Sequence, residues 1–483
     1  MTTTNPLVAK IWNYCHTLRD DGMGYGDYLE QLTYLLFLKI ADEYSKSPHH
    51  RDTQISEELA WESLLGRTGA DLETQYIRCL PELGWQTGMI GQIFFKAQNK
   101  IQNPAKLYKL VQLINAETWT MLDVDVKGEV YEGSIEKNAE NTKSGAGQYF
   151  TPRALIRAMV EWVRPQPMKT IADPACSTGG FFLAAYDYIS QQPLDIEEKK
   201  FLKYNTLQGW EIVPNTVQLC LMNLYLHNIG DLNPAPPIDR RDSLFELPRQ
   251  RFGYVLANPP FGKKSSTIIT NKDGDVERES LTCQRQDFWA TTANKQLNFM
   301  QHIRSMLKID GQAAVVLPDN VLFEGRAGEQ IWKQSLRSTD LHTILRLPTG
   351  IFYAQGVKAN VLFFDNKPAS RDSHTHELWV YDYRTNVKHT LKTNPLQTSH
   401  LADFVTCYRP GNRECRQESD RFRRFGYAEI TARDKTSLDI FWLKDDSLSD
   451  LDNLSHPDEF AGAIVENFEA ALVSFRTVAS QLA

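Results

Sequence analysis

No apolar run in this sequence is long enough to cross a membrane. A helix that spans the hydrocarbon core of a bilayer needs about 20 consecutive, mostly apolar residues. No stretch of the 483 residues approaches that composition, and the N-terminus has no apolar core like that of a secretory signal peptide. We therefore expect a cytoplasmic protein with no membrane partner.

Cysteine is also scarce. The chain has seven cysteines, which are scattered and form no CxxC pair. Structural zinc sites and disulfide frameworks need cysteines at close and regular spacing, preferably in an even number. We therefore expect neither a metal site nor disulfide bonds, as suits a reducing compartment.

An excess of basic residues is missing as well. Lysine and arginine number 53 against 60 acidic residues, so the net charge is −7. A protein that grips DNA unaided usually carries a basic excess. Any binding to DNA would need a local basic surface or a partner. One arginine-rich group is a candidate contact with DNA or a partner, or else a solvated face: Arg409, Arg413, Arg416, Arg421, Arg423 and Arg424.

The most informative residues present are Asn258-Pro259-Pro260-Phe261. They follow the apolar run 254–257, which predicts a buried strand. Proline cannot continue that strand, so the chain must turn at its carboxyl end, where ligands bind in open α/β sheets. An amide oxygen and a backbone carbonyl could accept the two N–H bonds of a planar amine there, while the aromatic ring stacks on it.

A second motif, Asp173-Pro-Ala-Cys-Ser-Thr-Gly-Gly-Phe181, lies about eighty residues upstream. It connects a short apolar strand to a helix that begins near Phe182. Glycine in such a turn lets the backbone approach a ligand closely, and the acidic residue can hold a positive or hydroxyl group. Cys176 within the turn is expected to be a small packing residue. A tight strand-to-helix connection would explain the glycines equally well.

Together these motifs resemble the S-adenosylmethionine-dependent methyltransferases that make N6-methyladenine in DNA. More narrowly, the chain is similar to the modification (M) subunit of type I restriction-modification systems. Residues 147–153, 285–289, 296–299, 317–323 and 438–444 also resemble segments of this subunit. The resemblance spans nearly the whole chain.

The resemblance implies a methyl transfer from S-adenosylmethionine to a flipped-out adenine. Asn258, Pro259, Pro260 and Phe261 would be the catalytic residues. Glu211 ends the strand predicted at 207–212, and a carboxylate there can accept both ribose hydroxyls of a cofactor. Asp242 would meet the cofactor's adenine amine. The remaining expected cofactor-binding residues are Gln148, Tyr149, Phe150, Thr151, Asp173, Ala175, Ser177, Thr178, Gly179 and Gly180. The implied partners are DNA, a specificity (S) subunit, a restriction (R) subunit and a second M subunit.

Periodicity predicts an α/β protein with a Rossmann-like methyltransferase domain. We expect an N-terminal helical domain over 1–137, with Leu29, Leu32, Leu36 and Ile40 on one buried face. The catalytic domain would cover 138–370, with strands near 170–173, 207–212, 254–257, 313–317, 342–346 and 360–364. A mixed extension would follow over 371–430, with a strand near 378–383. The polar stretch from Lys263 to Asn294 is expected to be a loop over the site, or else a solvated loop.

The last segment, 431–483, is predicted to be helical and to bind a partner. Ile464, Phe468, Leu472 and Phe475 give it an apolar stripe that would suit a partner helix or the chain's own core. Two other functions remain open from the sequence. One is methylation of a protein glutamine or of RNA, and the other is a non-catalytic assembly subunit that retained the fold.

Overall fold

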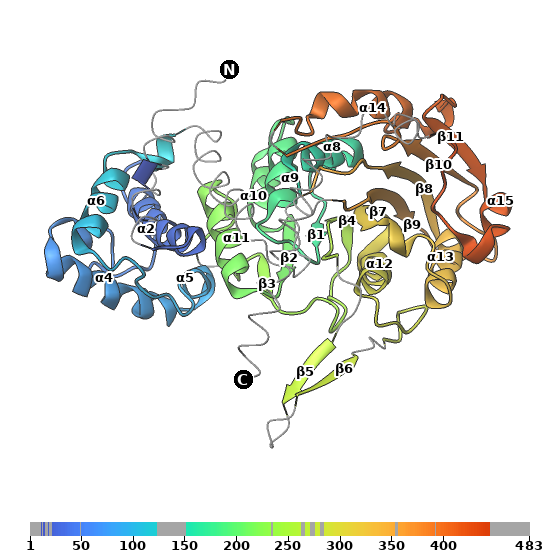
Figure 1. Cartoon of the computed structure of the whole chain (residues 1–483). Helices are drawn as coiled ribbons and strands as arrows, with labels where there is room; N and C mark the ends of the chain where they lie inside the picture. The colour runs from blue at the N-terminus through green and yellow to red at the C-terminus, as the bar shows by residue number, and fades with distance from the viewer. Residues whose placement is uncertain are drawn as a thin grey trace.

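A nine-stranded mixed sheet forms the centre of the protein, whose structure is a computed structural model. The structure describes residues 22–48, 50–122, 151–232, 235–261, 266–270, 276–280, 285–352, 356–391 and 393–444, with Ile11, Asn13, Tyr14 and Leu18. The strands lie side by side in the order β11-β10-β8-β9-β7-β4-β1-β2-β3 (Figure 1). Their bounds are β1 Ile171–Asp173, β2 Leu207–Glu211, β3 Ile238–Arg240, β4 Phe252–Ala257, β7 Leu307–Pro318, β8 Thr339–Arg346, β9 Ala359–Asn366, β10 Glu377–Asp382 and β11 Phe422–Gly426.

Strand direction places several motifs at one edge of this sheet. The strands β3, β2, β1, β4 and β7 run parallel to one another, whereas β9 is antiparallel to β7 and β8. The carboxyl ends of β1, β2, β3 and β4 therefore meet at a common edge. Ligands of open α/β sheets bind at that edge.

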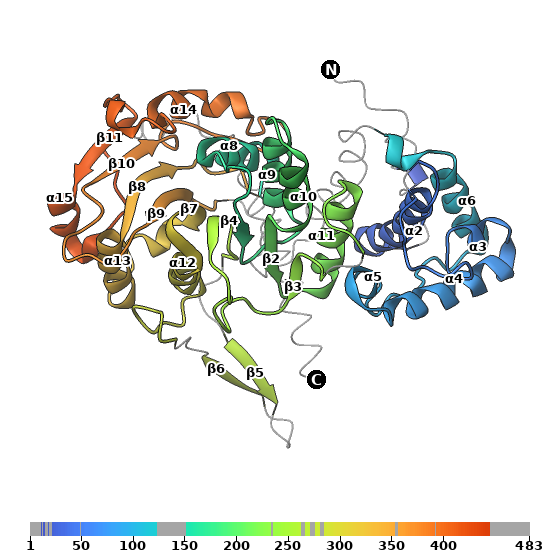
Figure 2. The ribbon, with the colours of Figure 1, turned by 180° about the vertical axis from the view of Figure 1, so that it is seen from behind.

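Helices cover both faces of the sheet and form two apolar layers. One face packs against α8 Arg153–Val163, α9 Gly180–Ser190, α11 Pro214–Leu226 and α14 Ala402–Tyr408. The other packs against α12 Lys295–Met306, α13 Ala327–Ser338 and α15 Tyr427–Thr431. Figure 2 shows the same arrangement from behind. The short helix α10 Ile196–Tyr204 precedes β2. This layering confirms the predicted α/β class.

The N-terminal part is helical, as predicted. It comprises α2 Tyr25–Ser45, α3 Glu62–Leu65, α4 Gly69–Gly84, α5 Gly88–Ile93 and α6 Pro104–Asn115. The predicted stripe of α2 is buried, so it is core packing. These helices dock on α11: the ring of Tyr225 lies 5.0 Å from that of Phe37, and Gln218 Nε2 donates to Phe95 O at 2.8 Å.

The predicted strands are all present, but the sheet is larger than expected. The strands β10 and β11 extend it beyond residue 370, and β11 is absent from the predicted strands. The stretch from Lys263 to Asn294 contains an antiparallel pair, β5 Ser266–Thr270 and β6 Val276–Ser280. This pair projects away from the body of the molecule (Figure 1), so β5 and β6 do not form the expected loop over the site.

The arginine-rich group is largely engaged within the fold. Arg416 is buried and donates to Tyr408 O, and Arg413 pairs with Asp340 and Asp365. Arg421 donates to two backbone carbonyls. Burial argues against a DNA contact for Arg416, while the side chains of Arg423 and Arg424 are exposed on β11.

None of the helices in the described part of the chain is long and apolar enough to span a bilayer. The C-terminal helix predicted around Ile464 lies outside the described residues, as do Gln148, Tyr149 and Phe150.

Candidate cofactor and base site

The glycine turn after β1 is a tight connection with no room for larger side chains. Gly179 precedes α9 with φ +84°, and its N–H donates to Cys176 O at 2.9 Å. A Cβ at Gly179 would lie 2.9 Å from Cys220 Sγ, and one at Gly180 would lie 2.8 Å from Ile156 Cδ1. Cys176 is buried, as expected of a packing residue. Backbone conformation and packing thus both require glycine at position 179.

Asp173 lies at the carboxyl end of β1 with its side chain buried. Its Oδ1 accepts the N–H of Ala175 at 2.9 Å. Burial, with a smaller contribution from Glu211, raises the pKa of Asp173 to about 8, although the Ala175 N–H opposes the shift. This carboxyl therefore holds a proton at neutral pH unless a positive charge comes close.

Glu211 and Asp242 follow the next two strands in the sheet. Glu211 ends β2, as predicted, and its Oε1 accepts the N–H groups of Ile212 and Val213 at 2.8 and 2.9 Å. Burial raises the pKa of Glu211, and the backbone N–H bonds oppose that change. Asp242 lies two residues beyond β3, is exposed, and accepts the N–H of Leu244 at 2.9 Å.

Asn258 follows β4 at the same edge and is held by Thr151. Its Nδ2 donates to Thr151 Oγ1 at 2.7 Å. Its Oδ1 is buried and accepts no hydrogen bond from any residue that the structure describes. A buried acceptor without a donor costs free energy, commonly about 1–3 kcal/mol, so such a group is usually explained by a ligand or water.

One pocket joins these elements. Of the predicted residues, Ala175, Ser177, Glu211, Asp242, Asn258 and Pro260 line it. Asp173, Thr178, Gly179, Gly180 and Pro259 do not line it, although they adjoin lining residues along the chain or belong to the same turns. Phe261 lies outside it too, with its ring 5.8 Å from that of Phe352 in an edge-to-face arrangement. The structure therefore gathers the cofactor-turn residues and the Asn-Pro-Pro residues at a single site.

Sequence reasoning missed half of the pocket lining. Its other members are Pro174, Trp210, Ile212, Arg241, Ser243 and Phe299. Five of these are adjacent in the sequence to predicted site residues, and that adjacency could have suggested them. Phe299 belongs to α12, which is distant in the sequence from the other lining residues. The only sequence feature that could have indicated it is the motif 296–299.

Arg285 fixes part of this pocket from outside. Its guanidinium donates to both carboxylate oxygens of Asp287 at 3.0 and 2.7 Å and to the carbonyl of Leu244 at 3.2 Å. Its Nη1 also lies 2.9 Å from His302 Nδ1. Burial and the neighbouring Arg285 lower the pKa of His302 to about 3, so the imidazole is neutral and accepts this bond.

Through these bonds Arg285 connects the loop that carries Asp242 and Ser243 to α12, which carries Phe299. Its guanidinium also lies 4.3 Å from the centre of the Phe288 ring. The motif 285–289 thus has a clear structural role: it joins two walls of the pocket.

The motifs 317–323 and 438–444 meet at the neighbouring part of the same edge. The carboxylate of Asp319 accepts from Arg384 and Asn360, and the N–H of Leu438 donates to Leu322 O at 2.8 Å. Asp439 pairs with Arg346 at 3.2 Å. These contacts hold the segment that leads to the C-terminus against the end of β7.

Comparison with known proteins agrees with this geometry. The profile of the N-6 DNA methylase family matches residues 122–438, and that of the HsdM N-terminal domain matches residues 7–114. The type I restriction enzyme StySJI methylase subunit of Salmonella typhimurium is 37% identical over 97% of this chain and 93% of its own length.

Solved structures give the same result. The type I restriction enzyme EcoKI M protein is 32% identical, with 99% of this chain and 96% of that chain covered and a TM-score of 0.55. A structure described in terms of complex assembly and conformational transition of the type I R-M system has a TM-score of 0.74 at 25% identity, over 100% and 99% of the two chains. The chain belongs to the N-6 DNA methylase family, among the methylase subunits of type I restriction enzymes.

Proposed function

We propose that the chain transfers a methyl group from S-adenosylmethionine to the N6 amine of an adenine flipped out of DNA, as the M subunit of a type I restriction-modification complex. The observation that carries this proposal is the unpaired, buried Oδ1 of Asn258 beside a pocket with two carboxylates. An acceptor in that position suits the N–H of an exocyclic amine.

The residues present fit S-adenosylmethionine. Glu211 presents a carboxylate at the end of β2, where it would accept the ribose hydroxyls, and Asp242 would accept from the adenine amine. Trp210, Ile212 and Phe299 supply apolar surface for a purine. Asp173, with the Gly179-Gly180 turn, would hold the methionine end. When bound, the cofactor supplies an activated methyl group on a sulfonium.

The residues around Asn258 would act on the target base. The Asn258 Oδ1 and the Pro259 carbonyl would accept the two N–H bonds of the adenine amine, which is a poor nucleophile because its lone pair is delocalised into the ring. Both oxygens would also stabilise the positive charge that develops on the nitrogen. Thr151 orients the Asn258 amide through the 2.7 Å bond. We further propose that Phe261 stacks on the base.

Base flipping is part of this proposal, and the buried Oδ1 of Asn258 supports it. The amine of a paired adenine lies inside the duplex and engages its complementary thymine, so it cannot reach an acceptor at the floor of a pocket. Enzymes that do chemistry on a base take it out of the stack and bind it in a pocket. Positioning would then be the main contribution of the protein to the rate.

Partners are expected to supply most of the DNA binding. The net charge of −7 opposes a polyanion, and three of the six clustered arginines are engaged within the fold. We propose that a specificity subunit reads the sequence and that two M subunits and a restriction subunit complete the complex, with the segment 431–483 as the contact.

The decisive experiment is to co-purify the chain with the products of its neighbouring genes and incubate the complex with DNA and methyl-labelled S-adenosylmethionine. Mapping should place the label on N6 of adenine within one defined sequence. Label on a protein glutamine or on RNA would indicate the other substrate class. Cofactor binding without any transfer would indicate an assembly subunit.

A further inference from the structure

A second cavity lies on the sheet away from the carboxyl ends of the parallel strands, where the first pocket is. It has a volume of about 720 Å³, within the range of roughly 300–1,000 Å³ that is usual for small-molecule sites. It shares no lining residue with the pocket at Asn258. Tyr254, which lines this cavity, lies four residues before Asn258 along the chain, so the two sites are roughly 13 Å apart along the strand.

The floor of this cavity is a row of side chains on three neighbouring strands. Gln312 of β7 is paired with Tyr254 of β4 on one side and with Asp365 of β9 on the other. Residues paired across strands point to the same face, so these three side chains line one surface.

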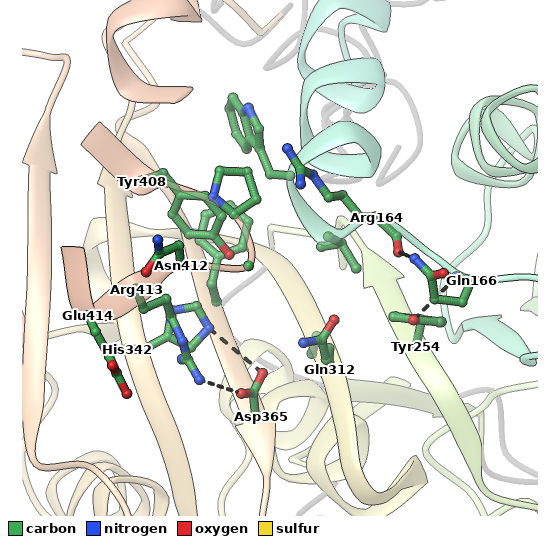
Figure 3. Close-up of a pocket in the computed structure, with 16 residues that line it drawn as sticks. Arg164, Gln166, Tyr254, Gln312, His342, Asp365, Tyr408, Asn412, Arg413 and Glu414 are labelled. Atoms are coloured by element: carbon green, nitrogen blue, oxygen red, sulfur yellow. Dashed lines mark hydrogen bonds and ion pairs between the residues drawn. The ribbon is translucent and has the colours of Figure 1, made fainter. Parts of the chain in front are cut away.

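A register shift adds a fourth polar side chain, that of His342. The pairing of β8 with β9 skips from Leu341 to Thr343, so His342 is the extra residue of an irregularity in the ladder. Such irregularities re-aim side chains. The imidazole Nδ1 lies 2.8 Å from Thr343 Oγ1. Its Nε2 lies 3.8 Å from Asp365 Oδ1, a contact that Figure 3 marks with a dashed line.

Two segments that follow helices form the walls. One comes after α8 and contributes Arg164 and Gln166; the other comprises Tyr408, at the end of α14, and the residues after it, including Arg413 (Figure 3). Arg413 is neutralised by Asp340 at 3.0 Å and Asp365 at 2.9 Å. The cavity therefore has little net charge at its centre, which does not favour a highly charged ligand.

The lining offers polar groups suited to a ligand. Trp162 Nε1 is a buried donor with no partner among the described residues. Tyr408, a residue that is 6% exposed, and Gln312 also line the cavity, and the Tyr408 hydroxyl and the Gln312 amide can each both donate and accept. Phe363 and Trp162 add aromatic surface to the lining.

We propose that this cavity binds a nucleoside or free nucleobase. A planar heteroaromatic ring carries donors and acceptors on its edge, which the Gln312 amide and the Tyr408 hydroxyl would satisfy, as glutamine does at adenine edges in DNA. Its faces would pack on the aromatic walls, since every base offers a π-face for stacking. The site is separate from the proposed methyl transfer and does not depend on it.

Photolabelling locates the ligand directly. The full-length chain is irradiated with 8-azidoadenosine, with and without excess adenosine, and the labelled peptides are identified by mass spectrometry. The proposal predicts label, removed by adenosine, on peptides that contain Tyr408 or Gln312. Label confined to peptides with Asp173, Glu211 or Asp242 would place the nucleoside in the other pocket and overturn the proposal, as would the absence of saturable labelling.

Two variants test the recognition. Tyr408→Phe removes only the hydroxyl and Gln312→Leu removes only the amide, and each should raise the adenosine concentration needed for half-maximal labelling by about tenfold. Tyr204→Phe, on α10 and outside the lining of both pockets, is the matched control and should leave that adenosine concentration unchanged. Far-UV circular dichroism confirms folding. Unchanged labelling in both folded variants would contradict the proposal.

Discussion

Burial controls the protonation of Asp173, at the end of β1. With its pKa raised to about 8, this carboxyl is protonated at pH 7 in the free protein. A positively charged ligand that approaches it favours the ionised form, so the proton should leave on binding. Cofactor affinity should therefore rise with pH until about pH 8 and then level off.

Calorimetry in two buffers measures this proton release. At pH 7 the apparent binding enthalpy of S-adenosylmethionine should differ between Tris and phosphate, because the two buffers take up the released proton with different heats. Asp173→Asn should abolish the difference. Equal binding enthalpies for the unaltered protein in both buffers would show that cofactor binding releases no proton from Asp173.

Gly179 permits a second prediction at the residue scale. Gly179→Val places a β-branched residue at φ +84° and directs its Cβ at Cys220 Sγ. The conformational strain alone costs on the order of 1–3 kcal/mol. We expect loss of S-adenosylmethionine binding together with a lower melting temperature.

Gly426→Val is the control for that substitution, because Gly426 has a negative φ and a Cβ added there would meet no atom within 4 Å. It should bind the cofactor normally. Normal S-adenosylmethionine affinity in a folded Gly179→Val protein would show that the glycine turn is not part of the cofactor site.

Residue-level expectations succeed where a residue's place follows from its position on a strand. Glu211 can be placed at the carboxyl end of a strand because it ends the segment predicted at 207–212, and Asn258 because prolines stop an apolar run. Phe299 cannot be recognised as a lining residue in this way, since α12 reaches the pocket only through tertiary packing. The burial of Asp173 behind the pocket lining is likewise a property of the packed fold, which no local pattern contains.

At the scale of elements, Arg285 joins the loop after β3 to α12. Lysine keeps the charge but lacks the planar fork that engages Asp287 through two bonds. Arg285→Lys should therefore loosen the wall that carries Asp242 and Ser243 and weaken S-adenosylmethionine binding by about tenfold. Calorimetry measures the affinity directly, without any DNA.

The control for this variant is Arg67→Lys, on the exposed segment after α3, where the guanidinium bonds one backbone carbonyl. Both proteins should unfold cooperatively. If cofactor affinity is the same in the two variants, the Arg285 cluster stabilises the fold without positioning the pocket.

The elements that escape prediction have identifiable reasons. The strand β11 has the sequence Phe-Arg-Arg-Phe-Gly, and its charges suggest a solvated segment. Exposed arginines are tolerated there because β11 is an edge strand, where charge also discourages further pairing. The pair β5–β6 does have a signal, since β-branched residues at 267–270 precede Asp273-Gly274, a favoured hairpin dipeptide.

At the scale of the whole molecule, charge predicts dependence on a partner. The isolated chain, with a net charge of −7, should bind DNA weakly and methylate it little. Adding the proposed specificity subunit should give sequence-specific binding whose affinity falls with rising salt concentration. Gel-shift titrations at two salt concentrations, with and without that subunit, measure the effect.

Truncation locates the proposed contact. Removing the residues after 450 should abolish co-purification with the specificity subunit while leaving cofactor affinity near normal. Efficient methylation of one defined sequence by the purified chain alone would contradict the partner model and indicate a self-sufficient methyltransferase.

The central claim is that Asn258 holds the target amine and not the cofactor. Its most direct test is to measure methyl transfer and S-adenosylmethionine affinity side by side in Asn258→Ala, assembled with its partners, against Asn205→Ala at an exposed site. The account predicts that transfer falls by on the order of 10²–10³-fold in Asn258→Ala alone, while cofactor affinity stays within about twofold in both variants. Cofactor affinity lost in parallel with activity, or transfer that persists without Asn258, would contradict it.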